Sequence, residues 1–211
     1  MASSAISAQG SVLSIATGSG SAKTISGVTL GNPTIVTATS HGFNVGDVVT
    51  IASVTGSTTV NGTWSVIAKT ANTFAIKLDT TGGSAYVSGG TATPVTYTAI
   101  GNTRSFSGFD GSASELDRSN LASTAKEYLL GLVDYGNLSV EYDLDNSDAG
   151  QIAMQSKFDS GILTGFKLVL PNSATAAFNA YVKKLPVSGG VDAIVRRSGV
   201  DLRISGPVTW S

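Results

Sequence analysis

The sequence predicts a mainly β protein with an antiparallel sheet, one α-helix laid against it and an inserted small β-barrel. Short runs of β-branched and aromatic residues recur along most of the 211 residues, separated by Gly, Asn, Ser and Thr. One segment alternates strictly between apolar and polar residues, which is typical of a half-buried strand. A single segment combines helical spacing with capping residues at both ends.

Charged residues are few and unevenly distributed. They make up 13% of the chain, about half the usual share, which suggests that partner subunits cover much of the surface. A β protein that exposes mainly Thr and Ser is the alternative. Residues 110–148 hold nine acidic and two basic residues, whereas residues 149–211 hold seven basic and three acidic. This split either lets an acidic face of one copy meet a basic face of another or reflects two solvated faces.

Several classes of protein lack the residues they need. The chain has no cysteine and only one histidine, His41, so it holds no thiolate zinc site and no Ser-His-Asp arrangement. His41 is expected to be a turn residue. No apolar run is long enough to span a bilayer, and the start of the chain lacks a classical signal, so we expect synthesis in a cytoplasm and no membrane insertion.

The segment 28–95 is interpreted as an inserted barrel domain. Strands are predicted at 48–51, 63–68 and 73–78, with turn signals such as Asn61-Gly62 between them. The flexible runs 82–84 and 88–90 close the segment. Trp64 is expected in its core.

The clearest strand is predicted at 137–145. Leu138, Val140, Tyr142 and Leu144 alternate with polar residues, which places Glu141, Asp143 and Asp145 together on the other face.

The helix is expected at about 148–160. Asp148 supplies an N-cap and Gly161 a C-terminus. Its predicted packing face consists of Ala149, Ile152, Ala153 and Phe158. Further strands are predicted at 165–170, 175–185, 192–197 and 200–205, the last two joined around Ser198-Gly199.

No catalytic, metal or cofactor site is predicted. Alternate residues of a strand lie about 6–7 Å apart, too far for Glu141, Asp143 and Asp145 to share one ion. The segment from Asp143 lacks the glycine and the final glutamate of a calcium loop. Gly18-Ser19-Gly20-Ser21 lacks the spacing of a phosphate-binding loop. An enzyme is therefore not expected.

From about Ile100 the order of features resembles the tail tube proteins, or major tail proteins, of long-tailed bacteriophages. The resemblance rests on the segments 115–117, 123–132, 135–140, 148–151 and 200–209, together with 8–15 near the N-terminus. It implies two packed antiparallel sheets with one flanking helix, formed by residues 1–27 and 96–211. It also implies a structural virion protein, located in the tail and assembled in the host cytoplasm.

The same resemblance implies homohexameric rings stacked head to tail around a channel for DNA ejection. The expected partners are other copies, the tape measure, the terminator and the distal tail protein, and genomic DNA passes without specific binding. Glu141, Asp143 and Asp145, with Glu115 and Asp117, are candidates for the lumen or the ring contact, because carboxylates repel phosphate; an ordinary solvated strand face is the alternative. The arm 2–14 and a long loop at 105–114 are candidates for joining rings.

The inserted segment resembles another module. The segments 36–43, 46–51, 61–64 and 72–74 are similar to the first catalytic cysteine half-domain of ubiquitin-activating enzymes. The likeness implies a barrel fold and no activation chemistry, since no cysteine is present. In a tube the barrel is expected on the outer surface.

A different class of function stays open. A glycan- or host-binding adhesin or fibre-associated module fits the same composition, as does a related tail terminator or baseplate ring protein.

Overall fold

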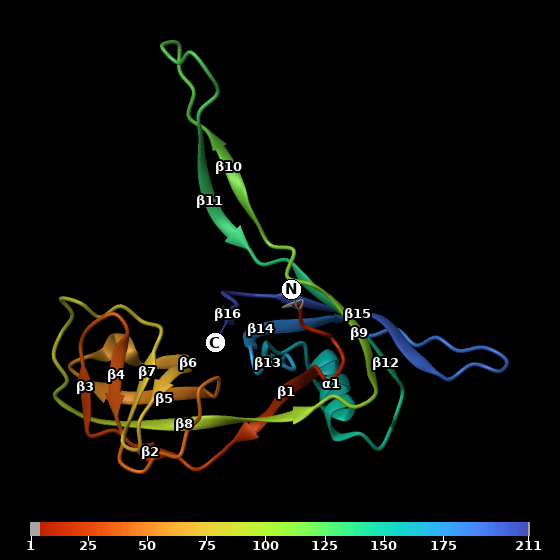
Figure 1. Ribbon diagram of the computed structural model, residues 1–211, viewed down its shortest axis with the longest axis horizontal. Helices are drawn as coiled ribbons and strands as arrows, with labels where there is room; N and C mark the ends of the chain where they lie inside the picture. The colour runs from red at the N-terminus through yellow and green to blue at the C-terminus, as the bar shows by residue number, and fades with distance from the viewer. Residues whose placement is uncertain (1–4, 211) are drawn as a thin grey trace. The chain divides into compact units, whose positions relative to one another are not determined.

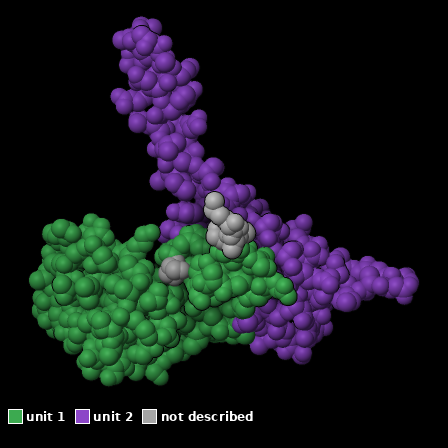
Figure 2. All heavy atoms as spheres, viewed as in Figure 1, with its two compact units in different colours: residues 1–98, 167–177, 209–211 green, residues 99–166, 178–208 purple. Residues whose placement is uncertain are grey.

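The computed structural model describes residues 5–210. Residues 1–4, which begin the predicted arm and the predicted 1–27 segment, and residue 211 lie outside the described residues. Half of the chain is strand and 7% is helix, so the protein is mainly β, with antiparallel sheets and one α-helix as predicted (Figure 1). The chain divides into two compact units, coloured in Figure 2.

Unit 1 comprises residues 1–98, 167–177 and 209–211. Its strands follow the order β3, β4, β7, β6, β5, β8, β1, with β13 beside β1, β2 paired with β8, and β16 paired with β14 at Ala176 and Ala177. The elements are β1 (Val12–Ser19), β2 (Lys23–Thr24), β3 (Gly27–Thr29), β4 (Thr34–Thr37), β5 (Val48–Thr55), the 3₁₀ turn η1 (Thr58–Val60), β6 (Gly62–Lys69), β7 (Thr73–Ile76), β8 (Ser88–Ala99), β13 (Thr164–Val169) and β16 (Thr209–Trp210).

The segment between β3 and β8 has a hydrophobic core of its own. Twelve buried residues form it, and all of them lie between Ile25 and Ala92. The predicted strands at 48–51, 63–68 and 73–78 are confirmed as β5, β6 and β7. Trp64 packs against this core and donates from Nε1 to the carbonyl of Val60 at 2.7 Å. The Gly-rich run at 88–90, predicted to be flexible, is the start of β8, and the predicted boundary at residue 95 falls inside that strand.

His41 is part of this core. The side chain is 3% exposed and lies against the rings of Phe43 and Phe74. The amide of Phe43 donates to Nδ1 at 2.9 Å, and Nε2 lies 3.1 Å from the carbonyl of Thr73. The predicted turn histidine therefore ties the segment before β5 to β7, because both ring nitrogens contact backbone groups.

Unit 2 comprises residues 99–166 and 178–208. Its sheet has the order β14 (Thr175–Lys184), β15 (Arg196–Ile204), β12 (Asn137–Asp143), β9 (Thr103–Gly108). A separate two-stranded sheet consists of β10 (Ser112–Asp117) and β11 (Tyr128–Asp134). The helix α1 spans Ala149–Ser160.

β12 confirms the predicted alternation but ends earlier than expected. Leu138, Val140 and Tyr142 are buried, and the residues between them are only partly exposed. The chain leaves the strand after Asp143, so Asp145 is not on the strand face as predicted. Its carboxylate instead accepts from the amide and hydroxyl of Ser147, a local turn that ends the strand.

The helix ends where predicted and packs through other residues than expected. Asp148 accepts from the amide of Gln151 at 2.8 Å, and Gly161 closes the helix with φ of 62°. The predicted face is wrong, since Ile152 and Phe158 are 54% and 40% exposed. The buried helix residues are instead Gly150, Gln151 and Met154.

Two further expectations in unit 2 are corrected. The two strands predicted at 192–197 and 200–205 are one strand, β15, which passes through Gly199 at φ of 74° where its pairing with β12 shifts register. A bulge replaces the predicted turn. The loop predicted at 105–114 is largely strand, because β9 continues to Gly108 and β10 begins at Ser112.

Candidate assembly surfaces

The predicted carboxylates on β12 lie within a set of ion pairs. Arg196 of β15 lies 3.2 Å from Glu141 and 3.6 Å from Asp143. Arg104 of β9 lies 3.4 Å from Asp143 on the other side. Glu141 and Asp143 thus share a face, as predicted, but two arginines compensate their charge. Asp145 stands apart from them in the following turn.

The remaining charges of this sheet face are also paired. Lys183 lies 3.8 Å from Asp201, and Arg203 pairs with Asp134. The backbone amide of Gly136 and the Arg203 guanidinium lower the pKa of the Asp134 carboxyl. In the part of the chain that the structure describes, Lys184 is the basic residue of β14 without an ion pair. The face is thus polar and nearly neutral.

The other two predicted residues, Glu115 and Asp117, lie on the separate β10–β11 ribbon. Lys126 contacts Asp117 at 2.6 Å and, with the Ser119 hydroxyl and amide, lowers the pKa of that carboxyl. No ion pair is found for Glu115 among residues 5–210. The structure therefore does not bring these two carboxylates together with those of β12.

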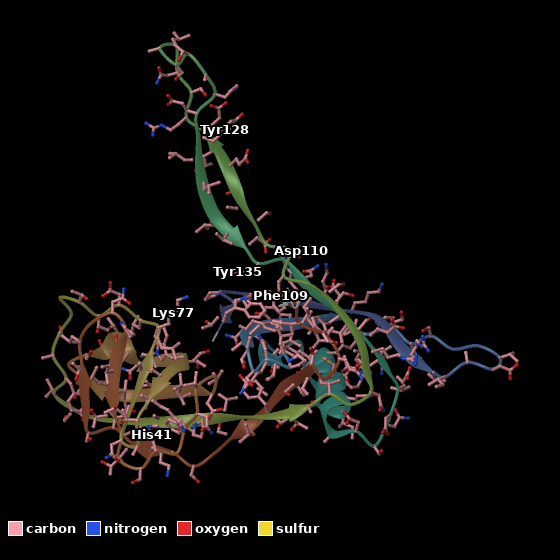
Figure 3. All side chains as sticks on the ribbon, viewed as in Figure 1. His41, Lys77, Phe109, Asp110, Tyr128 and Tyr135 are labelled. Carbon is pink, nitrogen blue, oxygen red and sulfur yellow. The ribbon has the colours of Figure 1, made fainter. Side chains whose placement is uncertain are left out.

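The ribbon and its ends form a surface that we call the acidic hairpin, residues 110–134. β10 and β11 pair only with each other, in the register Leu116 opposite Leu129 and Glu115 opposite Leu130. It extends from the sheet in Figure 3, with Asp110 at its base and Tyr128 farther along. The range contains five acidic and two basic residues.

Apolar side chains occupy both faces of the acidic hairpin. By strand alternation Tyr128, Leu130 and Leu132 share one face, and Leu129 and Val133 lie on the other. All five are at least half exposed; Leu130 is 73% and Leu132 91% exposed. A two-stranded ribbon buries neither face, so these side chains have no core of their own.

A second projecting segment was not predicted. We call residues 183–197, which join β14 to β15, the basic loop; it contains four basic residues and one acidic. Ser188 and Arg196 form an isolated bridge near its base. Beyond it, four apolar side chains are exposed: Val187, Val191, Ile194 and Val195. The apolar pair Ile194-Val195 looked like part of a strand in the sequence, which hid the loop.

The two projections leave opposite ends of the sheet. Asn137, at the start of β12, accepts from the amide of Phe109 just before the acidic hairpin. Asp143, at the end of β12, is opposite Arg196, where the basic loop rejoins the sheet. Strand register therefore separates them by the length of β12.

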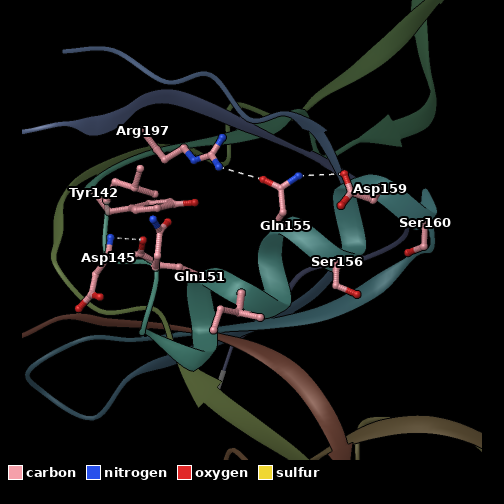
Figure 4. A pocket seen from close by; sticks show the side chains of 11 residues that line it. Tyr142, Asp145, Gln151, Gln155, Ser156, Asp159, Ser160 and Arg197 are labelled. Carbon is pink, nitrogen blue, oxygen red and sulfur yellow. Dashed lines mark hydrogen bonds between the residues drawn. The ribbon is translucent and has the colours of Figure 1, made fainter.

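A groove of about 650 Å³ lies along α1 (Figure 4). Arg197 donates to Gln155 at 2.9 Å, and Gln155 donates to Asp159 at 2.8 Å across it. Tyr142 lines its floor, and burial, with a smaller contribution from Asp148, raises the pKa of that phenol to about 12. These contacts fix side chains in place and leave no polar pair poised for proton transfer.

The described residues hold no group of three His, Cys, Asp or Glu side chains placed to bind a metal ion. Over the same range, no helix is long and apolar enough to cross a membrane.

Comparison with known proteins identifies one segment of the chain. No curated protein matches it. The family model of the FCCH domain of ubiquitin-activating enzyme E1 matches residues 31–96, about a third of the sequence. This range includes β4 to β7 and most of β8, the strands that enclose the core described above. Residues 31–96 are therefore similar to the FCCH domain of ubiquitin-activating enzyme E1.

Proposed function

We propose that this protein is a non-enzymatic structural subunit of a bacteriophage tail tube, which assembles into stacked rings around a channel for DNA. The acidic hairpin carries the proposal. Its leucines are exposed on a ribbon without a core, and apolar patches of this kind mark interaction sites. A subunit whose fold ends in such a ribbon gains buried apolar area when another subunit covers it.

The sequence adds the specific identity. The segments that resemble tail tube proteins include 115–117 and 123–132, which are the acidic hairpin, and 135–140 and 200–209, which are β12 and the end of β15. The resemblance is thus concentrated in unit 2 and in the surface that needs a partner. Homohexameric rings are the assembly that we propose.

The polar sheet face suits a wall along which DNA moves. Arg104, Arg196 and Arg203 each face a carboxylate within the same sheet or its flanks. Cations that are already paired release few counterions when phosphate approaches, so they contribute little to DNA affinity. We propose that the face with Glu141 and Asp143 borders the channel, and that Glu115 and Asp117 belong to a contact between subunits.

The proposal extends to partners and location. The protein resides in the virion tail after assembly in the host cytoplasm, where it meets other copies, the tape measure, the terminator and the distal tail protein. The FCCH-like segment lies on the outside of the tube, because a folded barrel in the channel would block DNA.

Negative-stain electron microscopy of the concentrated protein tests the proposal. Hollow tubes or stacked rings are expected, with added density on the outer surface that disappears when residues 31–96 are replaced by a short linker. A uniform population of monomers at high concentration would contradict it. Binding of that monomer to a glycan array would then favour an adhesin, and single rings that never stack would favour a terminator or baseplate ring protein.

A further inference from the structure

We propose that the acidic hairpin of one copy docks on the basic loop of the next copy, in a head-to-tail contact. The inference rests on the proposed self-assembly and names the two surfaces that meet. Both surfaces belong to unit 2, and each exposes apolar side chains that nothing else in that unit covers.

Apolar character is the first property that the two surfaces share. Leu130 and Leu132 of the acidic hairpin are 73% and 91% exposed, and Val191 and Ile194 of the basic loop are 95% and 60% exposed. Burying such side chains against each other removes apolar area from water at both sites.

Charge makes the two surfaces complementary. The acidic hairpin has three more acidic than basic residues, and the basic loop has three more basic than acidic residues. Within the hairpin, Lys126 and Arg118 already compensate Asp117 and Glu127. Among residues 5–210, Glu115 remains without an ion pair on one surface and Lys184 on the other, so a contact between copies offers each a partner.

Geometry decides between a two-fold and a head-to-tail contact. A two-fold interface brings the same patch of both copies together, which would place two acidic hairpins against each other. Like charges oppose that pairing. The two surfaces also leave opposite ends of β12, so a copy that uses both has a neighbour at each end of the sheet. Such contacts repeat and build a ring or a filament.

Two variants, each defective in one surface, provide the test. L130S/L132S alters the acidic hairpin, and V191S/I194S alters the basic loop. Because all four side chains are exposed, circular dichroism and thermal melting should match wild type for both variants. Ile152→Ser, an equally exposed apolar residue on α1, is the control that should assemble like wild type.

Size-exclusion chromatography with light scattering, and electron microscopy, give the readout. Each variant alone should lose the hairpin–loop contact and stop growing. An equimolar mixture should give a new species that contains both variants in equal amounts and does not grow further, since one intact hairpin meets one intact loop. In a second experiment, E115K and K184E should each raise the protein concentration needed for assembly, and the two reversals together in one chain should lower it again.

Other results would overturn the inference. Normal assembly of either variant would show that its surface is not used. Loss of assembly by the hairpin variant alone, with no new species in the mixture, would indicate a contact between two hairpins or with another protein. Wild-type monomers at high concentration would instead contradict the proposed function as well.

Discussion

The buried side chain of Gln151 on α1 donates from Nε2 to the carbonyl of Asp143, the last residue of β12, at 3.0 Å. The same amide donates to the carbonyl of Gly101 at 3.1 Å, and its Oε1 accepts from the amide of Asp145 at 2.9 Å. One polar side chain thus satisfies three backbone groups where the strand turns into the helix.

Replacing Gln151 with Leu should lower the free energy of unfolding by about 2–4 kcal/mol, because the variant leaves buried backbone groups without hydrogen bonds. Ser156→Ala, an exposed change on the same helix, should alter it by less than about 0.5 kcal/mol. Chemical denaturation monitored by circular dichroism measures both. Equal stability of the two variants would contradict the role given to Gln151.

His41→Phe should destabilise the FCCH-like segment, although the ring stays apolar and aromatic. The amide of Phe43 and the carbonyl of Thr73 would lose their partner, at a cost of about 1–3 kcal/mol for each buried group. Thr39→Ala, two residues earlier and exposed, is the matched control. Hydrogen exchange of the β5 and β7 amides should quicken only in the histidine variant.

Gly56→Ala and Gly82→Ala separate steric conflict from backbone strain. Both glycines have positive φ, 83° and 73°. A Cβ at Gly56 would lie 2.2 Å from the carbonyl oxygen of Ala85, whereas nothing lies within 4 Å at Gly82. The first change should prevent stable folding of the segment, and the second should cost about 1 kcal/mol from φ alone. Thermal melting of both variants checks the difference, and similar melting temperatures would contradict it.

Stability should fall between pH 10 and pH 12. Burial raises the pKa of Tyr142 to about 12, and burial together with the Asp47 carboxylate raises that of Tyr97 to about 12, from an ordinary value of 10.0. The folded state thus holds these protons more tightly than the unfolded chain. Their stabilising effect is complete below pH 10 and is lost as pH rises through the folded pKa, by at most about 2–3 kcal/mol for Tyr142.

Ultraviolet titration of the phenols provides the measurement. Two of the six tyrosines should ionise late, and Y142F should remove one of them and flatten the loss of stability. Ionisation of all six near pH 10 in the folded protein would contradict the prediction.

Removing the paired carboxylates should turn the polar sheet face into a DNA-binding surface. E141Q/D143N leaves Arg196 and Arg104 without counter-charges. The variant should gain weak affinity for duplex DNA that falls steeply with salt, whereas wild type should show little. Fluorescence anisotropy at two salt concentrations tests this. Asp159→Asn, which removes a carboxylate without freeing an arginine, should behave like wild type.

The sequence was most informative where local pattern and packing agree. Alternation at Leu138, Val140 and Tyr142 predicted β12, and Asp148 and Gly161 predicted the helix ends, because these signals act within a few residues. The helix face was mispredicted because Gln151 is buried through hydrogen bonds to Gly101 and Asp143, which no periodicity encodes. Ion pairing of Glu141 was equally hidden, since Arg196 lies fifty-five residues away in the chain.

The two projections have a consequence for how growth would stop. A filament joined through them is polar, because one end leaves an unfilled acidic hairpin and the other an unfilled basic loop. A cap that fits one end would not fit the other. Two unlike proteins are then needed to finish the polymer, and its length is set by when each arrives.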